Sequence, residues 1–286
     1  GGEPVALELG RRLPERLQNL ASTLPLSYPV EIIVVDDGSS DGTAEVTRLT
    51  SKTFPQISCI SYTRNQGKGK AVRTGMLAAQ GEYVVFSDAD NTFTPQHIES
   101  LIAKLKAENK VVIACRQSTN GERIQGESWQ RRLMGKCFNQ LVQAILLPGI
   151  KDSQCGLKGF HYQAAREIFC RQRLSGFAFD VEVLTLARAL GYEIAELEVK
   201  AIDCNGSRVN PLLAPAQMLM DLFRVRRALF FNAYALPDGN KAILRSGLLL
   251  GVFIAALGLR LPWLWEIPRF IDELKEVSLA YMIYSG

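Results

Sequence analysis

The chain has 286 residues, of which 47% are apolar and 22% are charged, so it can bury a sizeable core and is not a disordered or low-complexity chain. A net charge of +4 is too small to indicate a nucleic-acid partner. Six scattered cysteines without a CxxC pair, and only two histidines, argue against a disulfide framework and a His-ligated zinc site.

Helices and strands are predicted to alternate through the first 115 residues. Leucines spaced three and four apart predict an amphipathic helix over residues 8–24. Further helices are predicted at 44–52, 71–79 and 95–107, and strands at 30–35, 57–62, 83–86 and 111–114. This alternation predicts an α/β fold built on a mostly parallel, doubly wound sheet.

Two polar turns follow the first two strands. The strand at 30–35 ends in Asp36, Asp37 and Gly38. Open α/β sheets bind ligands beyond the carboxyl ends of their strands, so this acidic turn is predicted to lie at the binding edge. The second turn, residues 64–70, reads RNQGKGK and precedes a helix. Its glycines and lysines predict an anion site made of backbone N–H groups and point charges, with a flexible basic loop as the alternative.

The apolar strand at 83–86 leads into Asp88, Ala89 and Asp90. Side chains two apart on an extended chain point to the same side. The two carboxylates can therefore share one divalent cation, or one can act while the other orients. A solvated turn is the alternative, because ordinary composition gives about one Asp-x-Asp pair by chance in a chain of this size.

The second half continues the pattern after a polar stretch at 118–126. Helices are predicted at 128–147, 163–171 and 179–190, and strands at 157–160 and 192–199. The sequence KDSQCG, residues 151–156, connects the first of these helices to the first of these strands and contains Asp152.

The C-terminal part changes character. Residues 212–240 are predicted to form a basic amphipathic helix beside a membrane, and residues 242–265 are apolar enough to span it, with a buried core helix as the alternative. Basic residues before this span predict an integral membrane protein whose first 211 residues lie on the cytoplasmic side. They are Arg224, Arg226, Arg227, Lys241 and Arg245. In the membrane region 241–286, residues 277–284 are too short to cross, and a surface helix or an incomplete second span is predicted there.

Five motifs, in this order along the chain, resemble those of family 2 glycosyltransferases of the polyprenyl-phosphate type, especially dolichyl-phosphate β-glucosyltransferases. Dolichyl-phosphate mannose synthases and bacterial polyprenyl-phosphate glucosyltransferases are near relatives of these enzymes. The motifs are VVDDGSSDGT, NQGKGKAVRTGM, FSDADNTFTP, KDSQCGLKGF and FAFDVEVL. One family feature is absent: the opening apolar strand and Pro-x-x-Asn-Glu turn, in whose place PVALELGRRLPERL stands.

The resemblance implies a GT-A catalytic domain over residues 1–211, a nucleotide-sugar donor, a polyprenyl-phosphate acceptor, and Mg²⁺ or Mn²⁺ as cofactor. It implies that Asp88 and Asp90 hold the metal, and that Asp90 and Asp152 are catalytic, with Asp152 as the base. The residues implied in nucleotide-sugar binding are Asp36, Asp37, Gly38, Asn65, Gly67, Lys68, Asp88 and Ala89. Those implied in binding the acceptor phosphate are Arg116, Arg131 and Lys158.

Several of these roles have alternatives. A phosphate monoester is mostly a dianion at pH 7, because its second pKa is about 6, and it scarcely needs a general base. Asp152 can instead orient Arg131 or the metal, or serve in a turn. Arg131 can be a solvated charge on a helix face, and Lys158 a surface lysine.

The predicted function is an inverting transfer of glucose from UDP-glucose to a polyprenyl phosphate at the membrane. Mannose from GDP-mannose is the second choice. A membrane-tethered nucleotide-binding scaffold without enzymatic activity is the alternative from another class. The sequence does not fix the length of the lipid or the oligomeric state, and a homo-oligomer stays open.

Overall fold

The structure, a computed structural model, describes residues 30–40, 42–88, 92–107, 109–116, 129–200, 213–237 and 277–283. For residues 129–134, 136, 137, 213–216 and 277–283 it describes the backbone alone. The predicted helix at 8–24 and the predicted membrane span at 242–265 lie outside the described residues.

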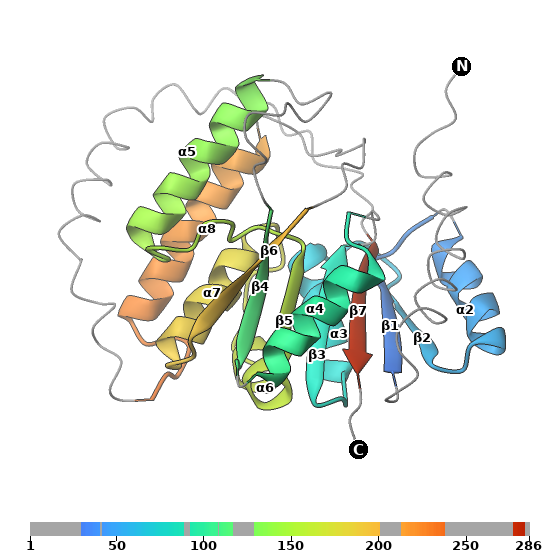
Figure 1. The fold of residues 1–286 in the computed structure, drawn as a ribbon. Helices are drawn as coiled ribbons and strands as arrows, with labels where there is room; N and C mark the ends of the chain where they lie inside the picture. Colours follow the sequence, from blue (N-terminus) through green and yellow to red (C-terminus); the bar gives the residue numbers. More distant parts are fainter. Residues whose placement is uncertain are drawn as a thin grey trace.

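The described strands form a seven-stranded sheet in the order β2-β1-β7-β3-β5-β4-β6 (Figure 1). They are β1 (Val30–Asp36), β2 (Ile57–Ser61), β3 (Tyr83–Asp88), β4 (Val111–Arg116), β5 (Leu157–His161), β6 (Ile194–Val199) and β7 (Val277–Ile283). The pairs β1–β2 and β4–β6 are parallel. In contrast, β5 runs antiparallel to β3 and β4, and β7 runs antiparallel to β1 and β3.

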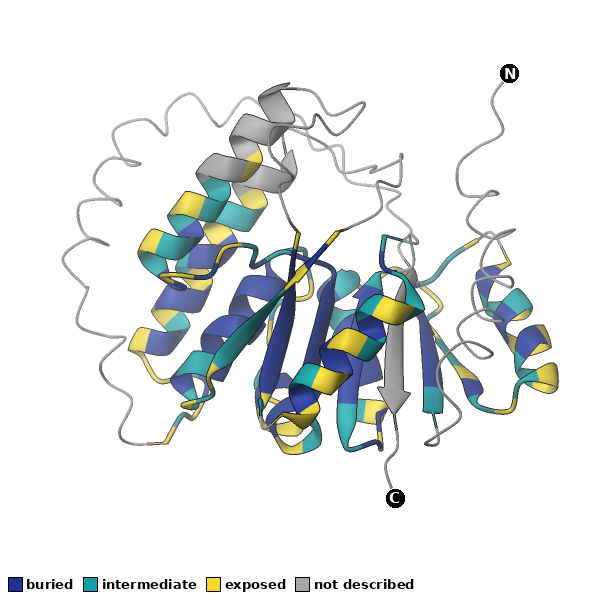
Figure 2. Ribbon diagram, in the orientation of Figure 1, coloured by how far each residue is buried: buried dark blue, intermediate teal, exposed yellow. Residues whose placement is uncertain are grey.

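Helices cover both faces of this sheet, as the sequence predicts. They are α2 (Thr43–Thr53), α3 (Lys68–Ala78), α4 (Pro95–Lys106), α5 (Trp129–Ile145), α6 (Tyr162–Phe169), α7 (Phe179–Ala189) and α8 (Leu213–Phe230). Alternate residues of β1 enter opposite clusters: Ile33 and Val35 lie in a cluster with residues of α3, α6 and α7, whereas Ile32 and Val34 lie in one with residues of α4. Figure 2 shows the buried central strands between helices whose exposed residues face outward.

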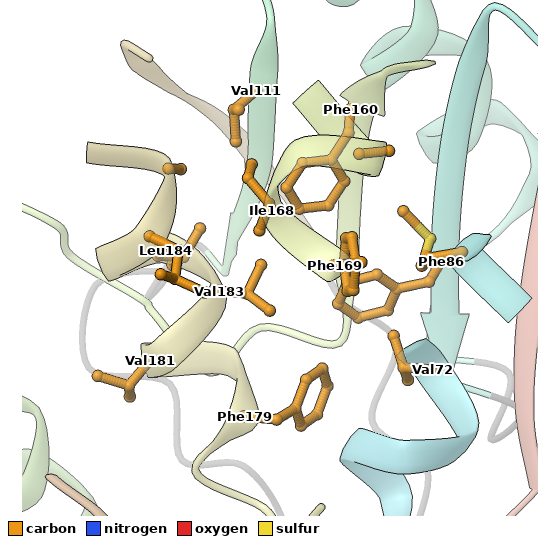
Figure 3. Close-up of a cluster of buried hydrophobic side chains, with 14 of the residues drawn as sticks. Val72, Phe86, Val111, Phe160, Ile168, Phe169, Phe179, Val181, Val183 and Leu184 are labelled. Atoms are coloured by element: carbon orange, nitrogen blue, oxygen red, sulfur yellow. The ribbon is translucent and has the colours of Figure 1, made fainter. Parts of the chain in front are cut away.

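Four phenylalanines lie at the centre of the larger cluster (Figure 3). The ring of Phe86 in β3 lies 5.8 Å from that of Phe179 in α7 and 6.4 Å from that of Phe160 in β5. The Phe160 ring in turn lies 5.2 Å from that of Phe169 in α6. Such pairs contribute about 0.5–1.5 kcal/mol each beyond their area burial. This packing fixes the end of β3, just before Asp88, against the start of α7.

The expectation of a mostly parallel sheet is wrong. Arg116 ends β4 at the same sheet edge at which Leu157 begins β5, opposite Ser87 of β3. Because the chain leaves and re-enters the sheet at one edge, β5 must run antiparallel to both of its neighbours. Antiparallel β7 makes the sheet still more mixed.

The prediction of a surface helix or incomplete second span at 277–284 is also wrong, because residues 277–283 form β7 in the middle of the sheet. The sequence VSLAYMI contains β-branched and aromatic residues that suit a strand. In this position β7 supplies hydrogen-bond partners to β1 on one side and β3 on the other. Among the described residues, no helix combines the length and apolarity needed to cross a membrane.

A helix lies within the predicted range 212–240 as α8, but it ends at Phe230, and its inner side packs into the larger cluster. Leu222, Val225 and Leu229 are buried in the larger cluster, where α8 packs against α5 and α7. Its outer side carries Met220, Arg224 and Phe230, which are exposed.

Candidate active site

Charged residues gather at one edge of the sheet, where β1, β3 and β4 all end. Asp36, Asp88 and Arg116 are the last residues of these three strands. The first residues of β7 lie between two of them, because Val277 pairs with Asp36 and Ser278 with Asp88. This edge is where the sequence predicts ligand binding.

Asp88 and the basic loop meet directly. The Lys68 ammonium lies 2.8 Å from Oδ1 of Asp88, and the Asp88 side chain keeps about a quarter of its surface exposed, with a relative accessibility of 26%. Two predicted donor-site residues from separate motifs are therefore neighbours, and their part in binding a donor stays a prediction. Asp90 and Ala89 lie outside the described residues.

The glycines of the basic loop allow close packing as well as a helix start. Gly67 has φ +96°, and a Cβ atom there would lie 2.4 Å from the Ser175 carbonyl oxygen. The Gly69 N–H donates to the same oxygen at 2.7 Å. Because only glycine fits this approach, the loop is pinned to residues 174–176 and Lys68 is directed toward Asp88.

The Asp36 and Asp37 carboxylates are buried and bonded within the protein. Asp36 accepts hydrogen bonds from the Ser39 N–H at 3.0 Å and the Ser61 hydroxyl at 2.9 Å. Asp37 accepts from the N–H groups of Gln66 and Gly67 at 2.7 and 2.8 Å. Burial raises the pKa of Asp37, although these N–H groups oppose the rise. Both aspartates thus shape the binding edge, and their contact with a nucleotide stays a prediction.

Gly38 and Asn65 lie beside each other at this edge. A Cβ atom on Gly38, which has φ +76°, would lie 2.7 Å from the Asn65 nitrogen. The acidic turn and the basic loop are therefore packed together, with exposed Asn65 at their junction.

Asp152 forms a two-pronged ion pair with Arg116. The Arg116 side chain donates from Nε to Oδ2 at 2.7 Å and from Nη2 to Oδ1 at 3.0 Å, and its backbone N–H donates to Oδ2 at 3.3 Å. Burial by itself raises the pKa of Asp152, but the Arg116 hydrogen bonds and the charges of Arg116 and Lys158 lower it overall. The hydrogen bond to Asp152 raises the pKa of Arg116. A carboxylate with a lowered pKa is a weak base, so this geometry favours an orienting role toward Arg116.

Lys158 is neither a surface lysine nor open to an acceptor phosphate. It is fully buried, and its ammonium donates to Asp180 Oδ1 at 2.5 Å and to the Cys155 carbonyl oxygen at 2.6 Å. The assignment to the acceptor phosphate is therefore wrong, because a phosphate cannot reach this ammonium without displacing the core. The described structure gives only the backbone of Arg131, in the first turn of α5.

Sequence reasoning assigned no role to Asp180 and Glu182, although both lie in the FAFDVEVL motif. Asp180 is the buried partner of Lys158. Glu182 accepts hydrogen bonds from the N–H groups of Arg173 and Leu174 and from the Tyr234 hydroxyl. Their burial could have been predicted from the sequence. Both carboxylates lie in the first turn of a helix among the apolar residues Phe179, Val181 and Val183, whereas a solvated helix face would carry polar neighbours.

The site offers carboxylate oxygen suited to a divalent cation. Asp88 offers partly exposed carboxylate oxygen at a strand end, and Mg²⁺ or Mn²⁺ uses one or two such carboxylates and retains water ligands. Among the described residues there is no cluster of three or more candidate metal ligands. The donor chemistry at Asp88 fits the cation, with Asp90 as the second expected ligand.

Comparisons with known proteins agree with this fold. Residues 6–169 match the family model of glycosyl transferase family 2. The chain is 33% identical to a dolichyl-phosphate β-glucosyltransferase of Dictyostelium discoideum, covering 75% of this chain and 70% of that one. It is 32% identical to the human dolichyl-phosphate β-glucosyltransferase, covering 81% and 76%.

Solved structures share the architecture at low sequence identity. Glucosyl-3-phosphoglycerate synthase from Mycobacterium tuberculosis, in complex with phosphoglyceric acid, matches with a TM-score of 0.55 and 17% identity over 79% of this chain and 77% of that one. The same enzyme in complex with Mn²⁺, UDP-glucose and phosphoglyceric acid matches with a TM-score of 0.51 and 17% identity, over 72% and 69%. These matches confirm the predicted GT-A fold.

Proposed function

This chain belongs to glycosyl transferase family 2 and is a glycosyltransferase, and on that premise we propose that it transfers glucose from UDP-glucose to a polyprenyl phosphate at a membrane surface. The observation that carries the proposal is the meeting of Lys68 and Asp88 at the same sheet edge as the Arg116–Asp152 pair. The curated relatives that are about one third identical are named for glucosyl transfer to dolichyl phosphate. The scaffold alternative is set aside, because these relatives are enzymes.

Lys68 and Asp88 form the donor side of the proposed site. A divalent cation held there, when bound, neutralises the charge that builds up on the departing nucleotide diphosphate. Asp88 would be one ligand for it, and Asp90 is the second expected ligand. Lys68 places a further positive charge 2.8 Å from Asp88, where it can move to the donor phosphates.

Arg116 forms the acceptor side. Asp152 engages Nε and Nη2 of the guanidinium, which uses two of its five N–H donors and fixes its plane. The side chain is half exposed, so the remaining donors can bind a phosphate. The two anionic substrates are thereby held by separate cationic side chains, Lys68 at the start of α3 and Arg116 at the end of β4, which is separated from β3 by β5.

The reaction that follows needs no strong protein base. A phosphate oxygen of the dianionic acceptor attacks the anomeric carbon, and the bond from that carbon to the donor phosphate breaks on the opposite side. The nucleotide diphosphate leaves with the electron pair. The configuration at the anomeric carbon inverts, and no proton has to be removed from the acceptor at pH 7.

The outer side of α8 supports the proposed association with a membrane on the cytoplasmic side. Met220, Arg224, Arg227 and Phe231 follow at spacings of four, three and four, so they share one side of the helix and its C-terminal turn. Met220 is 59% and Phe231 70% exposed. Large apolar side chains interleaved with arginines suit the surface of an anionic bilayer.

The donor assignment is tested with Asp88→Asn, with Glu45→Gln on the exposed side of α2 as control. We expect Asp88→Asn to lower transfer about 100-fold or more, because it weakens the electrostatic stabilisation of the leaving group, and to leave the melting temperature nearly unchanged. Added Mn²⁺ should stimulate the wild type and the control but not Asp88→Asn. Full activity in Asp88→Asn would remove the metal and donor assignment.

A further inference from the structure

A fully buried ion pair lies beneath the candidate active site. Lys158 is the second residue of β5, and its ammonium lies 2.5 Å from Asp180 Oδ1 and 5.3 Å from the centre of the Phe86 ring. Lys158 has no exposed surface and Asp180 is 3% exposed. Burying two charges costs more than their attraction returns unless the geometry is very favourable, so a matched apolar pair would stabilise the fold at least as well. This raises the question of what else the pair does.

The second hydrogen bond of Lys158 points to that role. Its ammonium donates to the carbonyl oxygen of Cys155 at 2.6 Å. Cys155 lies in the connection 152–156, which enters β5 at the site edge. Burial raises the pKa of the Cys155 thiol to about 12, so its thiol stays protonated and the residue takes part through its backbone.

The connection 152–156 touches both halves of the site. Its first residue, Asp152, holds Arg116. Its last residue, Gly156, accepts a hydrogen bond from the Asp88 N–H at 3.0 Å. A Cβ atom at Gly156 would lie only 2.1 Å from Asp88 Oδ2, so the Asp88 carboxylate packs directly against the Gly156 backbone.

We propose that Lys158 and Asp180 are positioning residues that hold the connection 152–156, and through it set the placement of Asp88 relative to Arg116. The pair touches no substrate, because it is buried, and acts through Cys155, Asp152 and Gly156. This inference rests on the proposed function, in which Asp88 serves the donor and Arg116 the acceptor.

A double variant separates this positioning role from a merely structural one, which predicts wild-type kcat whenever the protein folds. Lys158→Met or Asp180→Leu alone leaves one buried charge without its partner and should lower both the melting temperature and the activity. Lys158→Met with Asp180→Leu removes both charges, and the melting temperature should return close to the wild-type value. The Cys155 carbonyl oxygen still lacks its donor, so kcat should stay at least tenfold below wild type while the KM for the donor changes less than threefold.

Two further measurements complete the test. Lys106→Met, an exposed lysine of α4 whose ammonium lies 5.9 Å from the Tyr83 ring, is the matched control and should keep wild-type kcat. The Asp88 N–H donates to the Gly156 carbonyl oxygen, and this hydrogen bond should open more often once the connection 152–156 is less firmly held. Amide hydrogen exchange should therefore be faster at Asp88 in the double variant. If the Met and Leu variant does not fold, Lys158→Leu with Asp180→Ala removes the same charges with less side-chain bulk and likewise leaves the Cys155 carbonyl oxygen without its donor.

Wild-type kcat together with wild-type exchange at Asp88 in a folded double variant would overturn the proposal. The exchange measurement needs no substrate. If the wild-type protein transfers no sugar to polyprenyl phosphate, the proposed function fails, and the exchange at Asp88 still decides whether the pair positions this connection.

Discussion

Replacing Asp152 by asparagine separates an orienting role from that of a general base. Asp152 accepts bonds at 2.7 and 3.0 Å from the Arg116 side chain. Hydrogen bonds to charged groups contribute about 1.5–3 kcal/mol, and the half-exposed position of Arg116 favours the lower end through solvent screening. The expected loss in kcat/KM for the acceptor is therefore about tenfold. Loss of a general base would instead cost about 10²–10⁴-fold in kcat.

The pH dependence gives an independent measure of the same question. The pKa of Asp152 is lowered in the folded protein, so its contribution to stability is present above its unfolded pKa of about 3.9 and is lost as the pH falls through the folded value. Between pH 5 and 8 its charge is constant. The acceptor phosphate, with a second pKa of about 6, should then set the acidic limb of the rate profile.

The assay is initial-rate transfer at saturating donor and varied acceptor from pH 5 to 8. Asp152→Asn should raise the acceptor KM, keep kcat within a few fold of wild type, and retain the acidic limb. Arg116→Ala should raise the acceptor KM at least as much and leave the donor KM nearly unchanged. A loss of kcat beyond 100-fold in Asp152→Asn, together with loss of the acidic limb, would refute the reasoning and restore Asp152 as the base.

Three other changes test separate parts of the structure. Gly156→Ala should displace Asp88 and lower transfer at least tenfold, because the added Cβ would lie 2.1 Å from Asp88 Oδ2, whereas Gly135→Ala in α5 meets nothing within 4 Å and should keep activity. Equal activity of the two variants would contradict the contact. Tyr234→Phe removes the 2.7 Å hydrogen bond to Glu182 and should lower the free energy of unfolding by about 1 kcal/mol in urea titrations; an unchanged value would exclude this bond as a clamp on the end of α8. A chain that ends at residue 276 lacks β7 and should lose cooperative thermal unfolding, whereas one that ends at 283 should keep it. A cooperative transition in the shorter chain would show that β7 is dispensable for the sheet.

Local patterns predicted most of the fold because each depends on neighbours in the chain. The apolar run Tyr83–Phe86 predicts β3, and the leucines and isoleucines of residues 98–105 predict α4. β7 could not be placed in the same way. Its seven residues are consistent with several kinds of apolar segment, and its partners β1 and β3 lie about 190 residues or more away along the chain, which no local pattern reveals.

The sequence predicted which residues gather at the candidate site better than it predicted whether each of them is buried or exposed. Asp88 with Lys68, and Arg116 with Asp152, come together because strand ends share one edge, which follows from the βα alternation. Lys158 was misassigned because a sequence shows charge but not burial. A lysine between Leu157 and Phe160 in a strand was the signal that its side chain enters the core and needs a buried partner.

The central claim is tested most directly by a donor and acceptor screen with the purified full chain and Mn²⁺. UDP-glucose and GDP-mannose, each radiolabelled in the sugar, are incubated with polyprenyl phosphate or with the dephosphorylated polyprenol, and lipid-linked sugar is measured. The account predicts transfer from UDP-glucose to the phosphorylated lipid alone, and its loss in Asp88→Asn. Transfer from GDP-mannose instead, or no lipid product from a folded protein that binds UDP-glucose, would contradict it.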